Sequence, residues 1–588
     1  MQIRKTKIIC TLGPASESED VIRQLIQTGM NVARFNFSHG SYEEHLIRIN
    51  ALKKISGEMN KPVARLLDTK GPEIRTGLFK NGKTTLVAGE KVIIRHTDIE
   101  GSEKEFSISY KELHQDISTH SRILVDDGLL ELVVEKIKNK DICCRIENGG
   151  PISDHKSINI PGAELHLPAF TEKDREDILF AIKEDFDFIA VSFARKARDI
   201  QAFRRMLEKE GGTGIQIIAK IENGEGVDNF EDILKVSDGI MVARGDLGVE
   251  IAPEEVPILQ KKFIRLCQSF GKISITATQM LDSMIRNPRP TRAEVSDVAN
   301  AIFDGTSAVM LSGETAAGKY PAESLQLMAD IVQKTEGSIN YWQNMTDTRV
   351  TLIPTMANAI SHATCTTAMD LNASAIVAMT LSGHTARLVS RFRPGCPIIA
   401  STIHPRVQRQ LNLCWAVYPI CIDTVDDSEK VMNTTIEDAM QQGFLNDGDT
   451  VVATFGTPLG ISGSTNTIRV QNVGHAFVSG KGQPSSDPQK NRLTGIVKII
   501  RDPENIPENL NVDSSSSVIL VAPYTNNRMM PLIRKSSALI VEDDDPTSHS
   551  STAAMALDIP VILSCANATK NLTDGWTVTI DTVKGVVS

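Results

Sequence analysis

The chain has 588 residues, well beyond the ~250–300 that one hydrophobic core supports, so we expect three or four domains. Its net charge is 63 − 73 = −10 with a pI near 5.7, and the absence of a dense basic block argues against nucleic-acid binding. Nine scattered cysteines without a CxxC pair, and no apolar run approaching ~20 residues, predict a cytoplasmic protein without disulfides or a membrane span.

Eight short apolar runs alternate with amphipathic helical patterns such as 18–30 and 254–270. The runs are residues 7–10, 31–35, 63–67, 188–193, 215–220, 239–243, 273–277 and 307–311. Strands that alternate with helices predict a parallel sheet, and eight such units predict a (β/α)8 TIM barrel. A doubly wound open sheet is the alternative. The count of eight and the polar residues that follow nearly every run favour the barrel.

The third unit of this pattern is interrupted for about a hundred residues. Between 72 and 170 the segments alternate in polarity and are separated by Gly/Pro turns, which predicts an inserted β domain. The barrel then comprises 1–71 and 171–344, and Thr171 is the predicted N-cap where helices resume. A domain inserted at the catalytic face of a barrel can act as a lid.

Two further domains follow the barrel. Residues 345–474 read as an α/β domain with five strands. The pattern of residues 475–588 predicts a linker followed by a small extra domain. The composition of 479–491 predicts that this segment is a flexible linker.

Charged residues end the fifth and sixth runs of the barrel. In "IIAKIENGEG" (217–226), Lys220 and Glu222 are two apart and share a face of the strand, and Asp246 follows the next run. Two carboxylates on neighbouring strand ends suit Mg2+, and Lys220 beside the metal would neutralise a phosphoryl group or an enolate. The alternative is a structural ion pair between Lys220 and Glu222.

Hydroxyl residues end the last two runs. Thr278 and Ser312 could orient a carboxylate or relay a proton through water, and the alternative for each is helix capping. Gly245 allows close approach of the backbone, so its N–H and that of Asp246 could hold a carboxylate.

The second and third runs end in neutral or singly charged oxygen donors. Arg34, Asn36 and Ser38 alternate along one face of the second strand, and Asp68 and Thr69 follow the third. Asn36, Ser38, Asp68 and Thr69 are a candidate site for a monovalent cation such as K+. Arg34 is a candidate phosphate ligand.

Several stretches together resemble one known family. They are "NVARFNFSHG" (31–40), "LLDTKGPEIRTG" (66–77), "IIAKIENGEG" (217–226) and the long run 273–321, which ends in "MLSGETAAGKYP" (310–321). These stretches are similar to pyruvate kinases, and the resemblance spans residues 1 to about 473. It implies a barrel A domain, an inserted β lid (B domain) and an α/β C domain. It also implies transfer of a phosphoryl group from phosphoenolpyruvate to ADP, and a homotetramer.

The resemblance also implies roles for the candidate residues. Lys220 and Arg34 would contact the phosphoryl group, with Lys220 stabilising the enolate. Thr278, with the backbone of Gly245 and Asp246, would hold the substrate carboxylate. Ser312 with Thr278 would form a proton relay.

Metal and nucleotide sites are implied in the same way. Mg2+ or Mn2+ would be held by Glu222 and Asp246, and K+ by Asn36, Ser38, Asp68 and Thr69. Arg75 and Lys196 would contact the ADP/ATP phosphates. Glu73 stands where K+-independent members carry Lys, which predicts K+ dependence.

A loop in the C domain resembles the family's effector loop. Its residues are Thr380, Ser382, Gly383, His384 and Thr385, which follow a strand and open a helix, a natural phosphate nest. Leu381 replaces the Lys usual in members that respond to fructose 1,6-bisphosphate, and the loop 454–467 lacks an Arg for a second phosphate. We therefore expect a monophosphate effector such as AMP or ribose 5-phosphate.

The C-terminal segment 546–562 resembles the phosphohistidine domain of phosphoenolpyruvate-utilising enzymes, with His549 at the matching place. The acidic stretch 542–545 precedes it and would repel a phosphoryl group. We expect a structural or interface role without phosphotransfer.

Two other functions remain open at this stage. A Mg2+-dependent lyase or aldolase could use an enolate on the same barrel, although Arg75, Lys196 and the inserted lid argue against it. A sugar-phosphate sensor with an inactive barrel would require loss of Lys220, Glu222 or Asp246, and all three are present.

Overall fold

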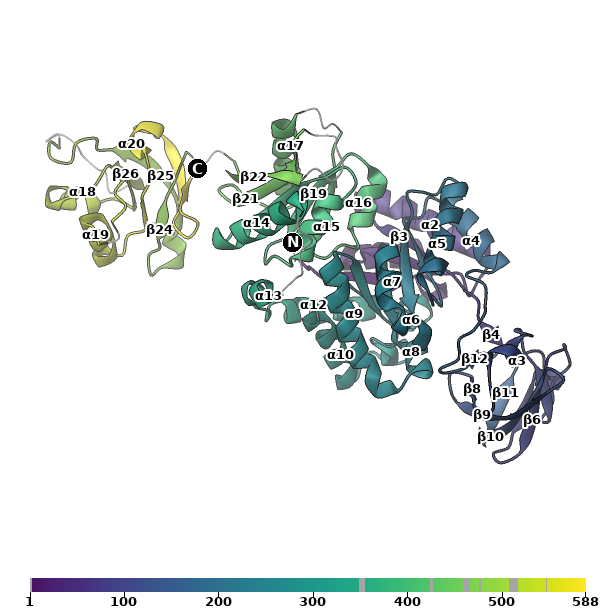
Figure 1. Ribbon diagram of the computed structural model, residues 1–588. Coiled ribbons are helices and arrows are strands. Elements are labelled where there is room, and N and C mark those ends of the chain that lie inside the picture. Colours follow the sequence, from purple (N-terminus) through teal and green to yellow (C-terminus); the bar gives the residue numbers. More distant parts are fainter. Residues whose placement is uncertain are drawn as a thin grey trace.

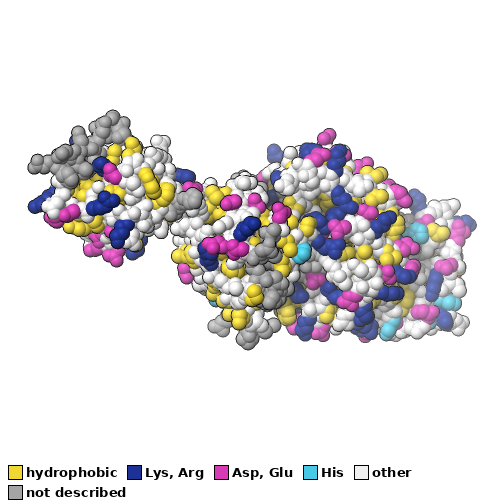
Figure 2. All heavy atoms as spheres, turned by 90° about the horizontal axis from the view of Figure 1, so that it is seen from above, with side chains coloured by type: hydrophobic (Ala, Val, Ile, Leu, Met, Phe, Trp, Pro, Cys, Tyr) yellow, Lys and Arg dark blue, Asp and Glu magenta, His cyan; other side chains and the backbone are white. Residues whose placement is uncertain are grey.

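The computed structural model contains a closed barrel flanked by further domains (Figure 1). It describes residues 3–347, 355–423, 427–458, 465–474, 477–506, 517–545 and 547–588. Among these residues, no helix is both long and apolar enough to cross a membrane. On the face seen in Figure 2, acidic and basic side chains are interspersed over the surface.

The eight predicted strands of the barrel are confirmed, and their order around it follows the chain. They are β1 (Lys7–Thr11), β2 (Val32–Asn36), β3 (Ala64–Asp68), β13 (Phe188–Val191), β14 (Gln216–Ile221), β15 (Gly239–Ala243), β16 (Ile273–Ala277) and β17 (Ala308–Leu311). All pairs are parallel, and β1 closes the barrel by pairing with both β17 and β2. Apolar residues fill these strands because one face packs inside the barrel and the other packs against helices.

Helices surround the barrel. The longer ones are α1 (Glu19–Thr28), α2 (Tyr42–Glu58), α4 (Glu172–Lys183), α5 (Ala197–Lys209), α7 (Phe230–Val236), α9 (Val256–Phe270), α10 (Arg292–Phe303) and α12 (Pro321–Glu336). Short helices follow three of the strands: α6 (Gly224–Asp228), α8 (Arg244–Glu250) and α11 (Gly313–Ala316). Thr171 caps α4 as predicted, since its side chain accepts a hydrogen bond from the N–H of Asp174.

A mostly antiparallel β domain separates β3 from β13. One sheet has the order β4 (Ile74–Arg75), β12 (Ser157–Asn159), β8 (Arg122–Val125), β9 (Leu130–Lys138), β10 (Asp141–Asn148), β6 (Lys91–Arg95) and β7 (Glu105–Ser107). Among the described strands of this domain, only β6 and β7 pair in parallel. A second pairs β11 (Gly150–Ser153) with β5 (Lys83–Leu86), and the helix α3 (Leu113–Asp116) lies between strands β7 and β8 in the chain. Apolar residues on one face of each strand form a separate core. We call this the lid domain; it projects from the barrel in Figure 1.

The α/β domain has a five-stranded sheet. Its order is β20 (Val417–Cys421), β19 (Ile398–Thr402), β18 (Ala375–Met379), β21 (Thr450–Gly456) and β22 (Thr465–Asn472), with β22 antiparallel. Its helices are α13 (Tyr341–Asp347), α14 (Met356–Asp370), α15 (His384–Arg391), α16 (Pro405–Leu411) and α17 (Ser428–Gln441). Arg409 on α16 pairs with Asp185 and Asp187 of the barrel, at the amino-terminal end of β13, and so fixes the α/β domain against that end.

The C-terminal domain has an eight-stranded sheet. Its order is β23 (Val478–Ser479), β30 (Val586–Val587), β29 (Thr577–Asp581), β25 (Arg492–Ile499), β26 (Val518–Ala522), β27 (Ala538–Val541), β28 (Val561–Leu563) and β24 (Lys481–Gln483). Its helices are α18 (Met530–Ile533), α19 (His549–Leu557) and α20 (Ala568–Asn571).

The prediction that 479–491 is a flexible linker is wrong for its first part. Residues 481–483 form the edge strand β24, which pairs antiparallel with β28. A Cβ on Gly482 would lie 1.8 Å from the carbonyl oxygen of Thr582, so glycine here permits a close approach of two backbones. Gly482 therefore allows two backbones to pack closely in the sheet, although the composition of the segment 479–491 is typical of a linker.

Candidate active site

Lys220 lies within an ionic cluster at the carboxyl end of the barrel. Its Nζ is 2.8 Å from Oε1 of Glu222 and 3.1 Å from Oδ1 of Asp68, and it donates a 2.8 Å hydrogen bond to Oγ of Ser192. Asp68 is fully buried and Glu222 is 1% exposed. Parallel strands place these residues together because β3, β13 and β14 are neighbours in the barrel.

Arg34 joins the same cluster from β2. Its Nε is 2.7 Å from Oδ2 of Asp68, and its Nη1 donates to Oγ1 of Thr11 at 2.9 Å. Asp68 thus holds one cation on each carboxylate oxygen. Pairing orients the two positive side chains that the sequence assigns to the phosphoryl group.

Burial and mutual charge set the protonation of this cluster. Burial disfavours the charge of Lys220, but Asp68 and Glu222 outweigh it and raise the pKa of Lys220 above its ordinary value. Burial also disfavours the charge of Asp68, but Lys220 and Arg34 lower its pKa below the ordinary value. Both Lys220 and Asp68 are therefore charged at neutral pH.

Unlike the pKa of Asp68, the pKa values of the two predicted magnesium ligands are raised. Burial raises the pKa of Glu222; Lys220 opposes this and Asp246 adds to it. Burial likewise raises the pKa of Asp246, and Lys220 offsets part of the effect. Two partly desolvated carboxylates that repel each other are stabilised by a cation between them, so this pair fits a divalent metal.

The number of donors also fits that assignment. In the described part of the chain, no three His, Cys, Asp or Glu side chains are grouped as a complete metal site. Mg2+ is usually held by one or two carboxylates with water and substrate phosphate oxygens completing six positions. Glu222 and Asp246 supply this smaller set.

Thr278 contacts the loop that carries Gly245 and Asp246. The N–H of Gly245 donates to Oγ1 of Thr278 at 2.8 Å, and this hydroxyl donates to the carbonyl of Ala277 at 2.6 Å. Thr278 has a φ of +66°, and Gln279 follows with +54°. Two consecutive side-chain-bearing residues with positive φ are strained, a feature that clusters at functional sites.

Ser312 follows β17 at the entrance to α11. Its Oγ is buried and has no hydrogen-bond partner among the described residues, whereas its N–H donates to Glu314. Glu314 also accepts from the N–H of Leu281, and burial raises its pKa. An unpartnered buried hydroxyl can take a water or a substrate atom.

The four residues of the predicted K+ site lie on adjoining strand ends. Asn36 and Asp68 are register partners, and Oδ1 of Asn36 accepts from the N–H of Ser38 at 3.2 Å. The carbonyl of Thr69 accepts from Oγ of Ser192 at 2.6 Å. In this structure Oδ2 of Asp68 contacts Arg34 and Oδ1 contacts Lys220. The sequence did not predict these two ion pairs.

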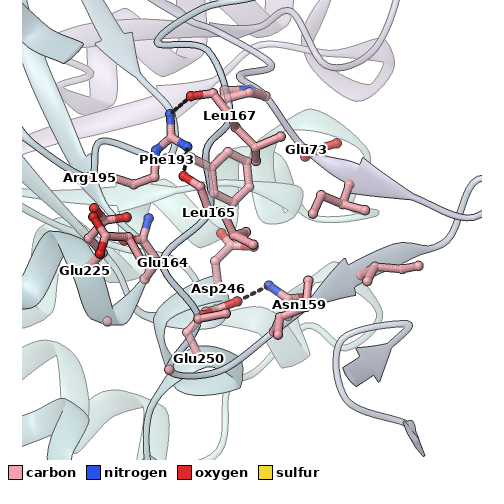
Figure 3. Close-up of a pocket in the computed structure, with 18 of the residues that line it drawn as sticks. Glu73, Asn159, Glu164, Leu165, Leu167, Phe193, Arg195, Glu225, Asp246 and Glu250 are labelled. Atoms are coloured by element: carbon pink, nitrogen blue, oxygen red, sulfur yellow. Dashed lines mark hydrogen bonds between the residues drawn. The ribbon is translucent and has the colours of Figure 1, made fainter. Parts of the chain in front are cut away.

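A cavity of about 730 Å3 lies between the barrel and the lid domain (Figure 3). Arg75, Lys196, Asp246 and Glu73 all line it. The Nε of Arg75 is 2.6 Å from Oε2 of Glu73, and Lys196 pairs with Glu164 and, at 2.9 Å, with Glu225. The two predicted nucleotide ligands therefore face the same space as one predicted metal ligand.

The lid closes around this cavity through polar contacts. Arg195 donates to the carbonyls of Leu165 at 3.1 Å and Leu167 at 2.9 Å, and Asn159 donates to Glu250 at 2.8 Å. Figure 3 shows these pairs on opposite sides of the opening. Polar contacts of this kind are suited to a domain that opens and closes.

The predicted effector loop connects β18 to α15. The N–H of Thr380 donates to Ser401, and Arg387 donates to the carbonyl of Ser382 at 2.6 Å. Gly383 has a φ of +80° and precedes His384, the first residue of α15. Thr385 is hydrogen-bonded to Thr465 through their hydroxyls at 2.8 Å. Residues 459–464 of the neighbouring loop lie outside the described residues.

His549 begins α19 in the C-terminal domain. Its Nδ1 is 2.8 Å from Oγ1 of Thr525, and its Nε2 is 3.1 Å from Oδ1 of Asn527. Both ring nitrogens are thus hydrogen-bonded within the domain.

Three residues of the candidate site were not singled out from the sequence: Thr11 and Ser192 in the ionic cluster, and Glu314 beside Ser312. Thr11 ends β1 and Ser192 directly follows β13, just as the predicted site residues end or follow their strands. Their position at a strand end was the signal in the sequence that could have identified them. Glu314 lies two residues after Ser312 and is buried, which no sequence pattern indicated.

Family models and known proteins agree with this arrangement. The model described as "Pyruvate kinase, barrel domain" matches residues 3–325, "Pyruvate kinase, alpha/beta domain" matches 358–471, and "PEP-utilising enzyme, mobile domain" matches 515–585. A pyruvate kinase from Sporosarcina psychrophila is 47% identical over 590 residues, covering 100% of this chain and 99% of its own length. One from Staphylococcus haemolyticus is 45% identical, with 100% and 99% covered.

Shorter relatives match the chain over four-fifths of its length. A pyruvate kinase from Clostridium acetobutylicum is 49% identical over 472 residues, which cover 80% of this chain and 100% of that protein. The crystal structure of a pyruvate kinase from Cryptosporidium parvum superposes with a TM-score of 0.77 at 38% identity, covering 80% of this chain and 96% of that one. By its barrel, its α/β domain and its full-length relatives, the chain belongs to the pyruvate kinase family.

Proposed function

We propose that this protein transfers the phosphoryl group of phosphoenolpyruvate to ADP, which gives pyruvate and ATP. The observation that carries this is the Lys220–Asp68–Arg34 cluster beside Glu222. Phosphoryl transfer requires little covalent chemistry and much positioning and charge neutralisation. Lys220 and Arg34, fixed beside the two carboxylates suited to Mg2+, provide both the positioning and the charge neutralisation.

The positive groups act on different parts of the substrate. Lys220 and Arg34 neutralise the phosphoryl oxygens, and Lys220 also stabilises the enolate oxygen that develops as the phosphoryl group leaves. Thr278, with the N–H groups of Gly245 and Asp246, orients the carboxylate. For this the N–H of Gly245 exchanges its hydrogen bond with Thr278 for one with substrate.

Proton delivery to the enolate carbon completes the reaction. Ser312 and Thr278 end neighbouring strands, and the buried Ser312 hydroxyl has no partner in the described protein, which leaves it available for a water. A water between the two hydroxyls would carry the proton.

Mg2+ or Mn2+ would be held by Glu222 and Asp246 and would neutralise charge on the transferring phosphoryl group. K+ would be held by Asn36, Ser38, Asp68 and Thr69, which requires Asp68 to share its oxygens between the cation and its present partners. The cavity lined by Arg75 and Lys196 would take the ADP phosphates.

Regulation and assembly extend this proposal. The loop Thr380–Thr385 would bind a monophosphate such as AMP or ribose 5-phosphate. His549 would have a structural or interface role, since both its nitrogens are hydrogen-bonded; a phosphate label on His549 after incubation with phosphoenolpyruvate would contradict this. We further propose a cytoplasmic homotetramer, for which the light-scattering mass is the test.

A coupled assay with phosphoenolpyruvate, ADP, Mg2+ and K+ tests the reaction. A kinase forms pyruvate only when ADP is present. A lyase or aldolase on the same barrel would turn over a suitable substrate without ADP, and that outcome would favour the alternative.

A further inference from the structure

Two segments of chain join the lid domain to the barrel. The outgoing segment (69–75) follows β3 and carries Glu73 and Arg75, which line the cavity between the barrel and the lid domain. The returning segment (160–171) follows β12 and ends at Thr171, the N-cap of α4. The position of the lid domain relative to the barrel therefore depends on how these two segments are held.

Asp174, the third residue of α4, is hydrogen-bonded to both segments. Its Oδ1 accepts from the N–H of Gly71 at 2.9 Å, and its Oδ2 accepts from the N–H and the hydroxyl of Thr171, each at 2.8 Å. Asp174 is fully buried, and the amino-terminal end of α4 favours its negative charge. One carboxylate thus ties together two segments that lie about a hundred residues apart in the chain.

The contact with Gly71 is separate from the capping of α4. Helices α2 and α10 have the same kind of capping box, but their third residues are glutamates, Glu44 and Glu294. In α4 the shorter Asp174 closes the box with Oδ2 alone, so Oδ1 can accept from Gly71. The cap and the contact with the outgoing segment can therefore be separated by substitution.

Gly71 connects Asp174 to one of the predicted nucleotide ligands. It has a φ of +73°, and a Cβ here would lie 2.9 Å from the Cβ of Ser192, so its backbone packs directly against the ionic cluster. The carbonyl of Gly71 accepts from the N–H of Glu73 at 3.0 Å, and Glu73 pairs with Arg75 at 2.6 Å. Each contact in this series fixes the next, and the series ends at Arg75.

The returning segment connects Asp174 to the other predicted nucleotide ligand. The carbonyl of Pro168 accepts from Arg195 at 2.9 Å, and Lys196, the next residue, pairs with Glu164 of the same segment. Since this segment ends at Thr171, its attachment to α4 also affects where Glu164 meets Lys196.

The residues proposed to contact phosphoenolpyruvate are held in a different way. Lys220 belongs to β14 and Asp68 to β3, and both strands are fixed by the barrel's own ladders. The N–H of Thr69 donates to the carbonyl of Ala190 at 3.0 Å, so the barrel holds the chain up to this residue. Loss of the Asp174 contacts should therefore affect the nucleotide and leave phosphoenolpyruvate binding intact.

We propose that Asp174 is a positioning residue for the nucleotide. By binding both connections of the lid domain, it fixes Arg75 and Lys196 at the cavity that would take the ADP phosphates. This inference rests on the proposed kinase function. Because the two cations would hold the ADP phosphates both before and during transfer, their displacement should raise KM for ADP and leave kcat nearly unchanged.

Asp174→Ala in the full-length protein tests the proposal. The variant lacks the acceptor for Gly71 as well as the cap of α4. We expect its KM for ADP to rise at least about tenfold, because a hydrogen bond to a charged group is lost, and its KM for phosphoenolpyruvate to stay close to the wild-type value. Thr171→Val is the matched control, since it weakens the cap but leaves Asp174 bound to Gly71. It should lower the melting temperature and keep the wild-type KM for ADP.

Hydrogen exchange, read at residue resolution by mass spectrometry, measures the same contact without the reaction. The N–H of Gly71 should be protected in the wild type and in Thr171→Val, and it should exchange freely in Asp174→Ala. Asp174→Glu takes the place of Asp174→Ala if that variant does not fold. A glutamate suits the capping box, but its extra methylene moves the carboxylate away from Gly71, so the same two effects are expected.

Three results would overturn the proposal. They are a Gly71 N–H that exchanges freely in the wild type, a KM for ADP that is the same in the Asp174 variant and in Thr171→Val, and an equal rise in the KM for phosphoenolpyruvate. A wild type that forms no pyruvate from phosphoenolpyruvate and ADP would instead contradict the proposed function, whereas the exchange result concerns Asp174 alone.

Discussion

Lys220 and Asp68 form a buried ion pair across the barrel mouth, with Nζ 3.1 Å from Oδ1. The other oxygen of Asp68 lies 2.7 Å from Nε of Arg34. One carboxylate on β3 therefore positions the cations of β2 and β14. This makes Asp68 a positioning residue in addition to its proposed role toward K+.

The first prediction concerns that carboxylate. Asp68→Asn leaves two buried cations without their shared counter-ion, so we expect kcat to fall by about tenfold or more and unfolding to become easier by roughly 3–5 kcal/mol. Steady-state kinetics at saturating substrates and thermal melts measure the two effects. Asp185→Asn, at the opposite end of the barrel, breaks pairs with Arg406 and Arg409 and should lower stability alone. Equal kcat values in Asp68→Asn and wild type would refute the positioning role.

The second prediction concerns K+. Glu73 lines the cavity beside Arg75, and a lysine at this position would place a fixed cation there. We expect the wild-type rate to depend strongly on K+ and the Glu73→Lys rate to be nearly independent of it. Glu73→Gln, which removes charge without adding a cation, should remain K+-dependent. The test compares the rates of each protein in a K+ salt and in a tetramethylammonium salt. A wild type that is equally active in both salts would rule out a required K+ site.

The third prediction concerns the effector loop. Thr385 is buried beside Thr465, and its hydroxyl is one of the donors proposed to hold a phosphate. A screen of AMP, ribose 5-phosphate and fructose 1,6-bisphosphate should show activation by a monophosphate. Thr385→Val should raise the half-saturating concentration about tenfold by removing a hydrogen bond to a charged group. The half-buried Thr366 on α14, away from the loop, provides the control Thr366→Val. Activation by fructose 1,6-bisphosphate alone would contradict the assignment.

The fourth prediction concerns Lys7 at the amino-terminal end of β1, next to the α/β domain. Its Nζ donates to the carbonyl of Val417 at 2.6 Å and lies 4.2 Å from the centre of the Tyr418 ring. Burial lowers the pKa of Lys7 to about 7. The unfolded chain, with a lysine pKa near 10.4, binds more protons between about pH 7 and pH 10, so this group adds stability as pH rises through that window.

Lys7→Met tests this linkage. The variant lacks the titrating group, so its stability relative to wild type should be highest near pH 7 and should fall toward pH 10, by about 1.4 kcal/mol per pH unit. Denaturant unfolding at several pH values measures the difference. The exposed Lys54→Met should show no such trend. A stability difference that is constant with pH would show that burial does not depress the pKa of Lys7.

Most of the barrel could be predicted because its signal is local. Each strand is a short apolar run, all but β3 are followed by a helix, and neighbouring runs in the chain are neighbours in space. The same logic placed Lys220, Glu222 and Asp246 together, since their strands are consecutive. The insertion between β3 and β13 was visible because the helical period stops.

Contacts that depend on side-chain direction were less accessible. Asp68 and Lys220 belong to strands separated by β13, and only the closed geometry shows that Lys220 spans this distance with Ser192 between. The edge strand β24 was missed because Gly482 serves close backbone packing, which its neighbours in the sequence do not reveal.

The turnover of Lys220→Met tests the central claim most directly. The variant should fold, as its thermal melt will show, and should still bind Mn2+ at Glu222 and Asp246 by electron paramagnetic resonance titration. Because it lacks the cation proposed to contact the phosphoryl group and the enolate, its kcat in the coupled assay should fall by about 10²–10³-fold or more. The exposed Lys235→Met should retain wild-type turnover. A folded Lys220→Met protein with near-wild-type kcat would contradict the account.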